Sequence, residues 1–233
     1  MNVVLLAGGK GLRLRPYTTV LPKPLLPLGD KPILEHLLNH LRRHNFTRVY
    51  LCVGYLSSLI RAYFGDGKNW GIEIEYVEED KPLGTAGSLS LLPEMKEPFL
   101  VLNGDLVTDL DFEDIVKYHI ANNSLLTIGV HKLNYKLPLG FLEVDDKNKI
   151  VDYIEKPVRT YNMSMGIYVC DPAVLKYVKK NEYLDFPDLT RLLIKDNGMV
   201  TPYFNDALWL DVGRPEEYEK AAELFENKKD SNS

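Results

Sequence analysis

Short apolar runs alternate with amphipathic stretches along the first half of this chain. Residues 3–6 read as a buried strand that ends at Gly8 and Gly9, and apolar residues between 32 and 43 recur at helical spacing. The same alternation predicts strands over 49–53, 72–77 and 99–102, and helices over 57–64, from Gly84 onward, and over 112–122. Such alternation implies right-handed crossovers and a Rossmann-like α/β fold, with a mostly parallel mixed sheet flanked by helices.

The second half has a different pattern. Runs at 125–130, 141–144, 150–154 and 166–169 predict strands with little helix between them, so mixed or antiparallel pairing is expected here. Helical patterns return at 172–178, 187–194 and 215–225. We expect a single domain over residues 1–226, in which the pattern of predicted strands and helices changes near residues 123/124. A disordered polar tail is expected over 227–233.

Composition excludes several classes of protein. The 233 residues are 45% hydrophobic, enough for a core, and the net charge of -5 argues against a nucleic-acid-binding surface. No stretch approaches the roughly 20 apolar residues of a membrane span, and no signal peptide precedes the first strand, so we expect a cytoplasmic protein with no membrane partner. Cys52 and Cys170 lie in apolar runs and are expected to be buried thiols.

The glycine-rich segment between residues 7 and 23 is the first candidate site. It follows the first predicted strand, at the carboxyl end where open α/β sheets bind ligands. Glycines let backbone amides approach phosphate oxygens, and four cations surround them: Lys10, Arg13, Arg15 and Lys23. Three glycines could also form a simple tight turn. Neither the Walker pattern nor the dinucleotide fingerprint is present.

Residues 6–16, together with Pro22-Lys23-Pro24, resemble the signature of sugar-1-phosphate nucleotidylyltransferases. The resemblance implies that the loop binds the nucleoside triphosphate, that Arg13 contacts its β- and γ-phosphates, and that Lys23 neutralises the reacting phosphates. It also divides the domain into a nucleotide-binding half (about 1–123) and a sugar-phosphate-binding half (about 124–226). Leu12 stands where the family usually has threonine. The loop residues expected to bind nucleotide are Leu6, Ala7, Gly8, Gly9, Gly11 and Leu12.

Two aspartates resemble the metal ligands of this family. Asn103-Gly104-Asp105 follows the predicted strand at 99–102, and Asp211 lies in Trp209-Leu210-Asp211-Val212-Gly213. Alone, each aspartate could be a turn or capping residue. Together they offer the one or two carboxylates that Mg²⁺ prefers beside substrate phosphates, so Asp105 and Asp211 are the expected metal ligands. Asn103 and Gly104 are expected to border the nucleotide.

Four further positions resemble the family's sugar-phosphate site. Gly140 and Glu155 would contact the sugar, and Lys156 would hold the acceptor phosphate. Ser164 replaces a sugar-facing asparagine, which suggests an acceptor other than an ordinary hexose phosphate. The alternative for Glu155 and Lys156 is an exposed ion pair at the end of a strand.

Residues 78–87 resemble the family's base-recognition stretch. A carboxylate such as Glu79 can accept both donors on one edge of guanine, whereas uracil and thymine offer one N–H. This favours GTP as substrate, with Gly84 and Thr85 also near the nucleotide. A uridylyl-, thymidylyl- or cytidylyltransferase, or a non-catalytic nucleotide-sugar-binding regulatory subunit, remains an alternative.

The expected reaction is an in-line attack of the sugar 1-phosphate on the α-phosphorus of the triphosphate, which releases pyrophosphate. The acceptor phosphate is nearly dianionic, because its second pKa is about 6, so no general base is required. His36, His40 and His44 recur every four residues, which could suggest a metal site, but no carboxylate motif completes one, so they are expected to mark one face of a surface helix. Some relatives carry an added β-helix, for which this length leaves no room, so a stand-alone enzyme is expected. Members of the family often form dimers, and the resemblance implies a homodimer.

Overall fold

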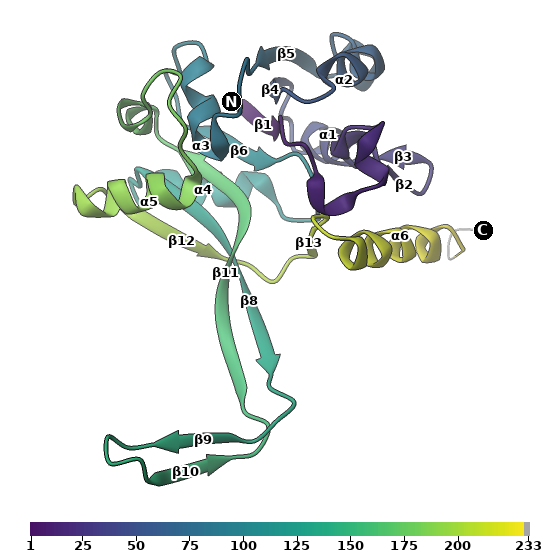
Figure 1. Cartoon of the computed structure of the whole chain (residues 1–233). Helices are drawn as coiled ribbons and strands as arrows, with labels where there is room; N and C mark the ends of the chain where they lie inside the picture. The colour runs from purple at the N-terminus through teal and green to yellow at the C-terminus, as the bar shows by residue number, and fades with distance from the viewer. Residues whose placement is uncertain (231–233) are drawn as a thin grey trace.

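The structure is a computed structural model that describes residues 1–230. A seven-stranded sheet forms its centre, in the order β12-β8-β11-β6-β1-β4-β5 (Figure 1). Six strands run in one direction, and β11 alone runs antiparallel to its neighbours β6 and β8. The predicted mostly parallel mixed sheet is confirmed. The strands are β1 (Asn2–Ala7), β4 (Arg48–Val53), β5 (Glu73–Glu78), β6 (Phe99–Asn103), β8 (Leu126–Lys136), β11 (Val158–Cys170) and β12 (Val200–Phe204).

Helices cover both faces of this sheet. The first face packs against α1 (Ile33–Arg43), α2 (Ser57–Phe64) and α4 (Phe112–Ala121), and the second against α3 (Gly84–Gly87) and α5 (Phe186–Lys195). Because side chains alternate along a strand, Leu5 joins the first core and its neighbour Val4 joins the second. Cys52 and Cys170 are buried free thiols in the second core, as predicted, and burial raises the pKa of Cys52 to about 12.

Two pairs of short strands lie outside the central sheet, and one of them joins distant segments of the chain. β7 (Leu106–Thr108) pairs antiparallel with β13 (Trp209–Asp211), and β2 (Pro27–Leu28) pairs with β3 (Lys31–Pro32). A third apolar cluster joins Leu14 of the glycine-rich segment to Val212 and to Ala221 of α6 (Pro215–Asp230). The last helix therefore supports the segment that follows the first strand.

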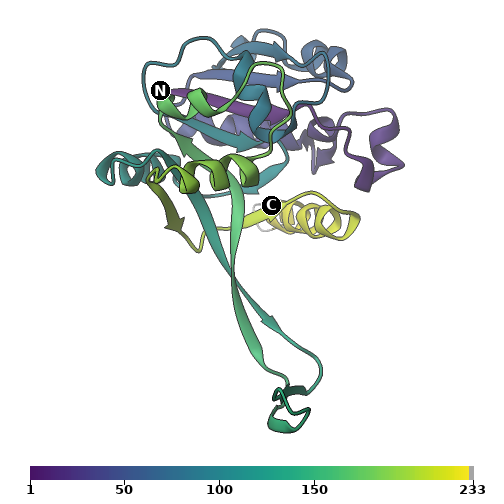
Figure 2. The ribbon, with the colours of Figure 1, turned by 60° about the vertical axis from the view of Figure 1, so that its left-hand side comes forward.

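An arm projects from the sheet. β8 and β11 continue past its edge as a two-stranded ribbon, which ends in a hairpin of β9 (Phe141–Val144) and β10 (Ile150–Ile154) (Figures 1 and 2). We define the arm as residues 132–164. Its strands pair without interruption from Val130↔Ser164 to Lys136↔Val158.

The root of the arm is fixed by the body. β11 changes register between Ser164 and Tyr168, and within this irregularity Met165 is buried. The carbonyl of Met165 accepts a hydrogen bond of 2.8 Å from Trp209 Nε1. Gly166 has a φ of +69° and packs directly on the Asn103 side chain. The direction of the arm is thus set by residues next to the predicted site.

Several expectations about elements need correction. The stretch 172–178 forms a 3-10 helix (Pro172–Tyr177), and the helix from Gly84 is a single turn that continues as a 3-10 helix (Ser88–Leu91). The predicted disordered tail is wrong over residues 227–230, because α6 extends to Asp230 in a segment rich in the helix formers Glu, Lys and Ala. Residues 231–233 lie outside the described part of the chain.

Two of the three histidines lie in α1 and His44 follows it directly; all three are half-buried, so they do not form the exposed surface face that we expected. His36 and His40 contact the backbone carbonyls of Leu28 and Leu110 at 2.9 and 2.8 Å, and His44 lies 3.2 Å from Asp111. Burial lowers the pKa of His40. They join α1 to neighbouring segments. Among residues 1–230, no helix is long and apolar enough to span a membrane.

We expect Gly166→Ala to destabilise the protein. A positive φ costs a non-glycine residue about 1–2 kcal/mol, and the added Cβ would overlap Asn103, so the free energy of unfolding should fall by about 2 kcal/mol or more. Gly9→Ala is the matched control, since nothing lies within 4 Å of its new Cβ. Urea denaturation of both variants measures the difference, and equal stabilities would contradict the role given to Gly166.

Candidate active site

The glycine-rich segment leaves β1 at the carboxyl edge of the sheet. Gly11 is in the left-handed conformation, with φ 60° and ψ 32°, and its carbonyl accepts a hydrogen bond of 2.8 Å from the Thr18 hydroxyl. A Cβ on Gly11 would lie 2.9 Å from Thr18 Cγ2. Leu14 is buried below, whereas Gly9 and Arg13 are exposed. The segment therefore has a fixed base and an accessible rim.

Glu79 lies against this segment. It follows β5, and its Oε1 is 2.8 Å from the position that a Cβ on Gly8 would take. Its Oε2 accepts a hydrogen bond of 3.1 Å from the Leu83 amide. Burial raises the pKa of Glu79, and the Leu83 hydrogen bond lowers it. The residue predicted to recognise the base is thus adjacent to the residues predicted to bind the phosphates.

A nearly buried ion pair joins Lys23 to Asp105. Lys23 begins the 3-10 helix Lys23–Leu25 and is 9% exposed, while Asp105 follows β6. Because β6 is next to β1 in the sheet, both residues reach the same edge. Oδ2 of Asp105 contacts the lysine, whereas Oδ1 is buried and has no hydrogen-bond partner among the described residues.

Asp211 completes a pair of carboxylates with Asp105. The antiparallel pairing of β13 with β7 places Asp211 opposite Leu106, and the Val212 amide donates to the Asp105 carbonyl at 3.2 Å. Burial raises the pKa of Asp211, and the negative charge of Asp105 raises it further, while Lys23 and Arg13 lower it. Two residues separated by more than one hundred positions therefore form one acidic site.

Arg13 and Glu217 border this site. A Cβ on Gly213 would lie 3.3 Å from Asp211 Oδ1, 3.3 Å from Glu217 Oε2 and 3.5 Å from Arg13 Nη2, so these groups surround Gly213 closely. The Gly213 amide donates to Glu217 Oε2 at 3.1 Å. Glu217 was not predicted from the sequence. Its place in the first turn of a helix that begins with a proline was the available signal.

These residues fit a magnesium ion. Mg²⁺ favours oxygen ligands and usually takes one or two carboxylates, with water and substrate phosphates as its other ligands. Asp105 offers a buried oxygen, Oδ1, that has no partner among the described residues, and burial together with the negative charge of Asp105 raises the pKa of Asp211. Among the described residues, no group of three or more His, Cys, Asp or Glu side chains could hold a metal ion.

Other predicted nucleotide contacts have structural roles in this arrangement. The Gly104 amide donates to the Leu6 carbonyl at 2.9 Å, which joins the ends of β6 and β1. The amide and hydroxyl of Thr85 both bind Asp185, at 2.8 and 3.1 Å. Gly84 packs on Leu184 with a φ of +78°. Their contact with a nucleotide stays a prediction.

The predicted sugar residues are not at this edge of the sheet. Gly140, Glu155 and Lys156 lie at the far end of the arm (Figure 1). Six residue steps separate Ser164↔Val130 from Val158↔Lys136, which is about 20 Å of ribbon. Ser164 alone is at the root of the arm, where its hydroxyl lies 3.4 Å from that of Tyr168.

The residues at the tip of the arm do contact one another. The Tyr153 hydroxyl donates to Glu155 Oε2 at 3.0 Å, and a Cβ on Gly140 would overlap the Tyr153 ring. Glu155 and Lys156 form a loose ion pair of 3.7 Å, and both side chains are exposed. Tyr153 is a second residue that was not predicted, because no local pattern distinguishes it from other strand tyrosines.

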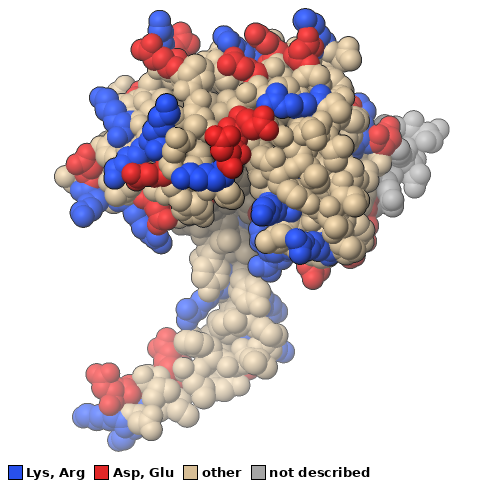
Figure 3. All heavy atoms as spheres, turned by 45° about the horizontal axis from the view of Figure 1, so that its top comes forward, with Lys and Arg blue, Asp and Glu red and all other residues tan. Residues whose placement is uncertain are grey.

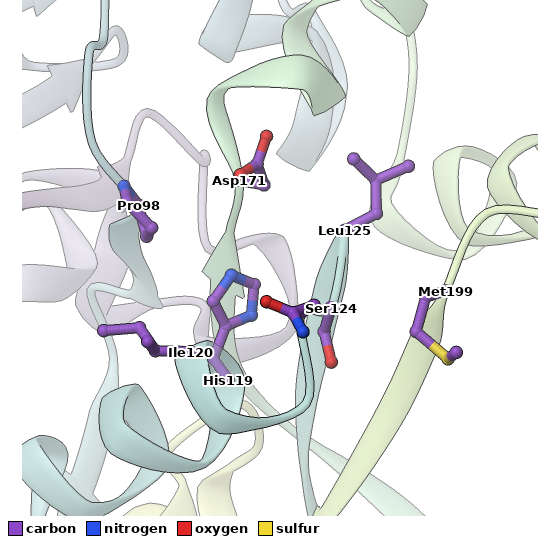
Figure 4. A pocket seen from close by; sticks show the side chains of 8 residues that line it. Pro98, His119, Ile120, Ser124, Leu125, Asp171 and Met199 are labelled. Carbon is purple, nitrogen blue, oxygen red and sulfur yellow. The ribbon is translucent and has the colours of Figure 1, made fainter.

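A hollow elsewhere on the molecule has a different character. It lies beside the start of β6 and β8, at the opposite edge of the sheet (Figure 4). Its lining contains no lysine, arginine or glycine, so it lacks the cations and the glycine-rich backbone that surround the candidate site. The lining residues of the hollow are Pro98, His119, Ile120, Asn123, Ser124, Leu125, Asp171 and Met199.

The molecular surface shows no separation of charge on the face drawn in Figure 3, where lysines and arginines are interspersed with acidic residues.

Comparisons with known proteins agree with this geometry. The chain is 34% identical over 242 residues to the UTP–glucose-1-phosphate uridylyltransferase of Synechocystis, with 95% of this chain and 62% of the relative covered. It is 30% identical to the mannose-1-phosphate guanylyltransferase of Mycobacterium tuberculosis, with 94% and 62% covered. The chain thus spans about 62% of the length of these relatives.

A solved structure shares the fold. HddC from Yersinia pseudotuberculosis, complexed with GMP-PN, superposes with a TM-score of 0.76 at 26% identity, over 96% of this chain and 99% of that one. The sequence profile described as nucleotidyl transferase matches residues 2–228. The chain belongs to the nucleotidyl transferase family.

Proposed function

We propose that this protein condenses a nucleoside triphosphate with a sugar 1-phosphate, giving a nucleoside diphosphate sugar and pyrophosphate. The observation that carries the proposal is the convergence of Lys23, Asp105 and Asp211 beside the glycine-rich segment. Exposed backbone and Arg13 at its rim suit a triphosphate, and the paired carboxylates suit a divalent cation.

The reaction we propose needs no protein nucleophile. An oxygen of the acceptor phosphate attacks the α-phosphorus in line, a new P–O bond forms, and the bond between the α- and β-phosphates breaks to release pyrophosphate. The residues bind and orient the two phosphates and neutralise their charge, with Arg13 and Lys23 on the triphosphate and Lys156 on the acceptor. Glu155 and Gly140 would contact the sugar, and Ser164 lies at the root of the arm that bears them.

Asp105 and Asp211 would hold Mg²⁺, which when bound withdraws charge from the phosphate oxygens. Lys23 orients Asp105 through the ion pair. Glu217 restrains Gly213 next to Asp211.

We further propose that the base is guanine. Glu79 projects a carboxylate toward the glycine-rich segment and still has Oε1 available, because only Oε2 binds the Leu83 amide. The relative from M. tuberculosis is named as a guanylyltransferase, and HddC was solved with GMP-PN. The relative from Synechocystis is named as a uridylyltransferase, so the uridylyl alternative is tested alongside.

An activity matrix tests the function directly. Pyrophosphate release should be fastest with GTP when GTP, UTP, dTTP, CTP and ATP are each combined with a panel of aldose 1-phosphates. Turnover with another nucleotide only would refute the guanine assignment. Absence of turnover in every combination, with nucleotide sugar still bound, would instead support the regulatory subunit.

Asp105→Asn should abolish most of the activity. The substitution keeps the size of the side chain but removes a charge from the metal site, and we expect kcat to fall by about 10²–10³-fold. Asp206→Asn is the matched control, because Asp206 is exposed in the loop between β12 and β13. Steady-state kinetics at saturating magnesium measures the loss, and thermal unfolding checks that both variants fold. Unchanged turnover would remove Asp105 from the mechanism.

Glu79→Gln should weaken the preference for GTP. The amide cannot accept both guanine donors, so kcat/KM for GTP should fall by about ten- to a hundred-fold relative to UTP. Glu78→Gln serves as control, since Glu78 instead binds Ser57 and Arg61 on the surface. Competition between the two nucleotides measures the ratio directly. The same ratio in Glu79→Gln and in the unaltered enzyme would show that Glu79 does not recognise the base.

A further inference from the structure

The arm has no core of its own. None of the residues 132–164, a segment that the structure describes throughout, is buried. An isolated two-stranded ribbon is marginally stable in water, and large exposed apolar surfaces usually mark interaction sites. Twelve large apolar side chains are exposed here, namely Leu133, Tyr135, Leu139, Leu142, Val144, Ile150, Val151, Tyr153, Ile154, Val158, Tyr161 and Met163.

Contacts at its root hold the arm away from the candidate active site of its own chain. Met165 is buried and held by Trp209, and Gly166 packs on Asn103, so the first residues of the ribbon are fixed in direction. Pairing then continues without a bulge from Val130↔Ser164 to Lys136↔Val158. Folding the arm back would break these pairs or the contacts at the root.

The body carries a complementary apolar surface next to its site. Leu12, Tyr17, Val20 and Leu21 are exposed along the glycine-rich segment, and Val20 is 71% exposed. An apolar ribbon laid over these residues would bury both surfaces. It would also explain a leucine at position 12, where the resemblance leads us to expect threonine.

We propose that two copies of this chain exchange arms. Each arm lies over residues 12–21 of the partner and brings Glu155 and Lys156 to the partner's Lys23, Asp105 and Asp211. A two-fold axis makes both contacts equivalent, and exchange of an identical element is an economical route to a dimer. The arm alone has as many residues as the roughly 20–30 that each side of a standard interface contributes. The role of Glu155 and Lys156 rests on the proposed function, but the exchange itself does not.

Chemical crosslinking tests the exchange without reference to activity. In the double variant Val20→Cys/Leu139→Cys, a short bismaleimide should link two chains into a covalent dimer. The unaltered protein is the control, because Cys52 and Cys170 are both buried. A link within one chain would show that the arm folds onto its own body. Absence of any link from a protein that sediments as a monomer would also overturn the proposal.

The apolar residues of the arm should hold the dimer together. Ile150→Asn/Val151→Asn should shift sedimentation from dimer to monomer, whereas Ile194→Asn/Met199→Asn, at exposed apolar positions of the body, should leave the dimer intact. Circular dichroism checks that both variants keep their folded body. A dimer that persists in the arm variant would contradict the role of this surface.

Complementation then tests whether the site is shared. Each proposed site combines Asp105 of one chain with Lys156 of the other, so Asp105→Asn and Lys156→Ala chains should each be inactive alone. After exchange of subunits, one of the two sites in each mixed dimer carries neither substitution. At equal amounts, about a quarter of the sites and of the activity should return, given random pairing in a two-fold dimer. No recovery from a crosslinked dimer would refute the shared site. Inactivity of the unaltered protein would count against the proposed function alone.

Discussion

The buried ion pair between Lys23 and Asp105 is the contact on which the candidate site depends. It joins the segment after β1 to the segment after β6, so the glycine-rich loop and the acidic site are held in one geometry. Loss of one partner of a buried pair leaves an unpaired charge, which typically costs about 3–5 kcal/mol. The cost of burying this pair is reduced because the Asp105 side chain is partly exposed to solvent. Lys23 and Arg13 also supply positive charge beside the two carboxylates.

Periodicity predicted the elements that have enough residues to show it. The eleven residues of α1 carry a continuous apolar stripe, and the five residues of β6 form an uninterrupted apolar run. β7 and β13 have three residues each, too few for any pattern, and they pair across a separation of about a hundred positions. The tail was misjudged because residues 226–230 are polar, although three of them, Glu226, Lys228 and Lys229, are good helix formers.

The site was only half predictable, for a geometric reason. Residues that follow parallel strands reach the same edge of the sheet, so the positions of Asp105 and the glycine-rich segment followed from the order of elements. Glu155 and Lys156 follow a strand of the arm, whose direction depends on one irregularity at Gly166. Nothing in the local sequence shows whether a paired ribbon turns toward the body or away from it.

The hairpin at the end of the arm has consequences for newly made chains. Within the described residues, β9 and β10 pair only with each other, so each presents a free edge to which strands of other molecules can add. Lys147 and Lys149 lie in the turn between these strands, and Asp145 and Asp146 precede them. Charges at such edges discourage continuous strand addition. Glu143 of β9 and Asp152 of β10 place charges on the edge strands themselves. We therefore expect these charges to limit the addition of strands from other chains while the apolar ribbon is still uncovered.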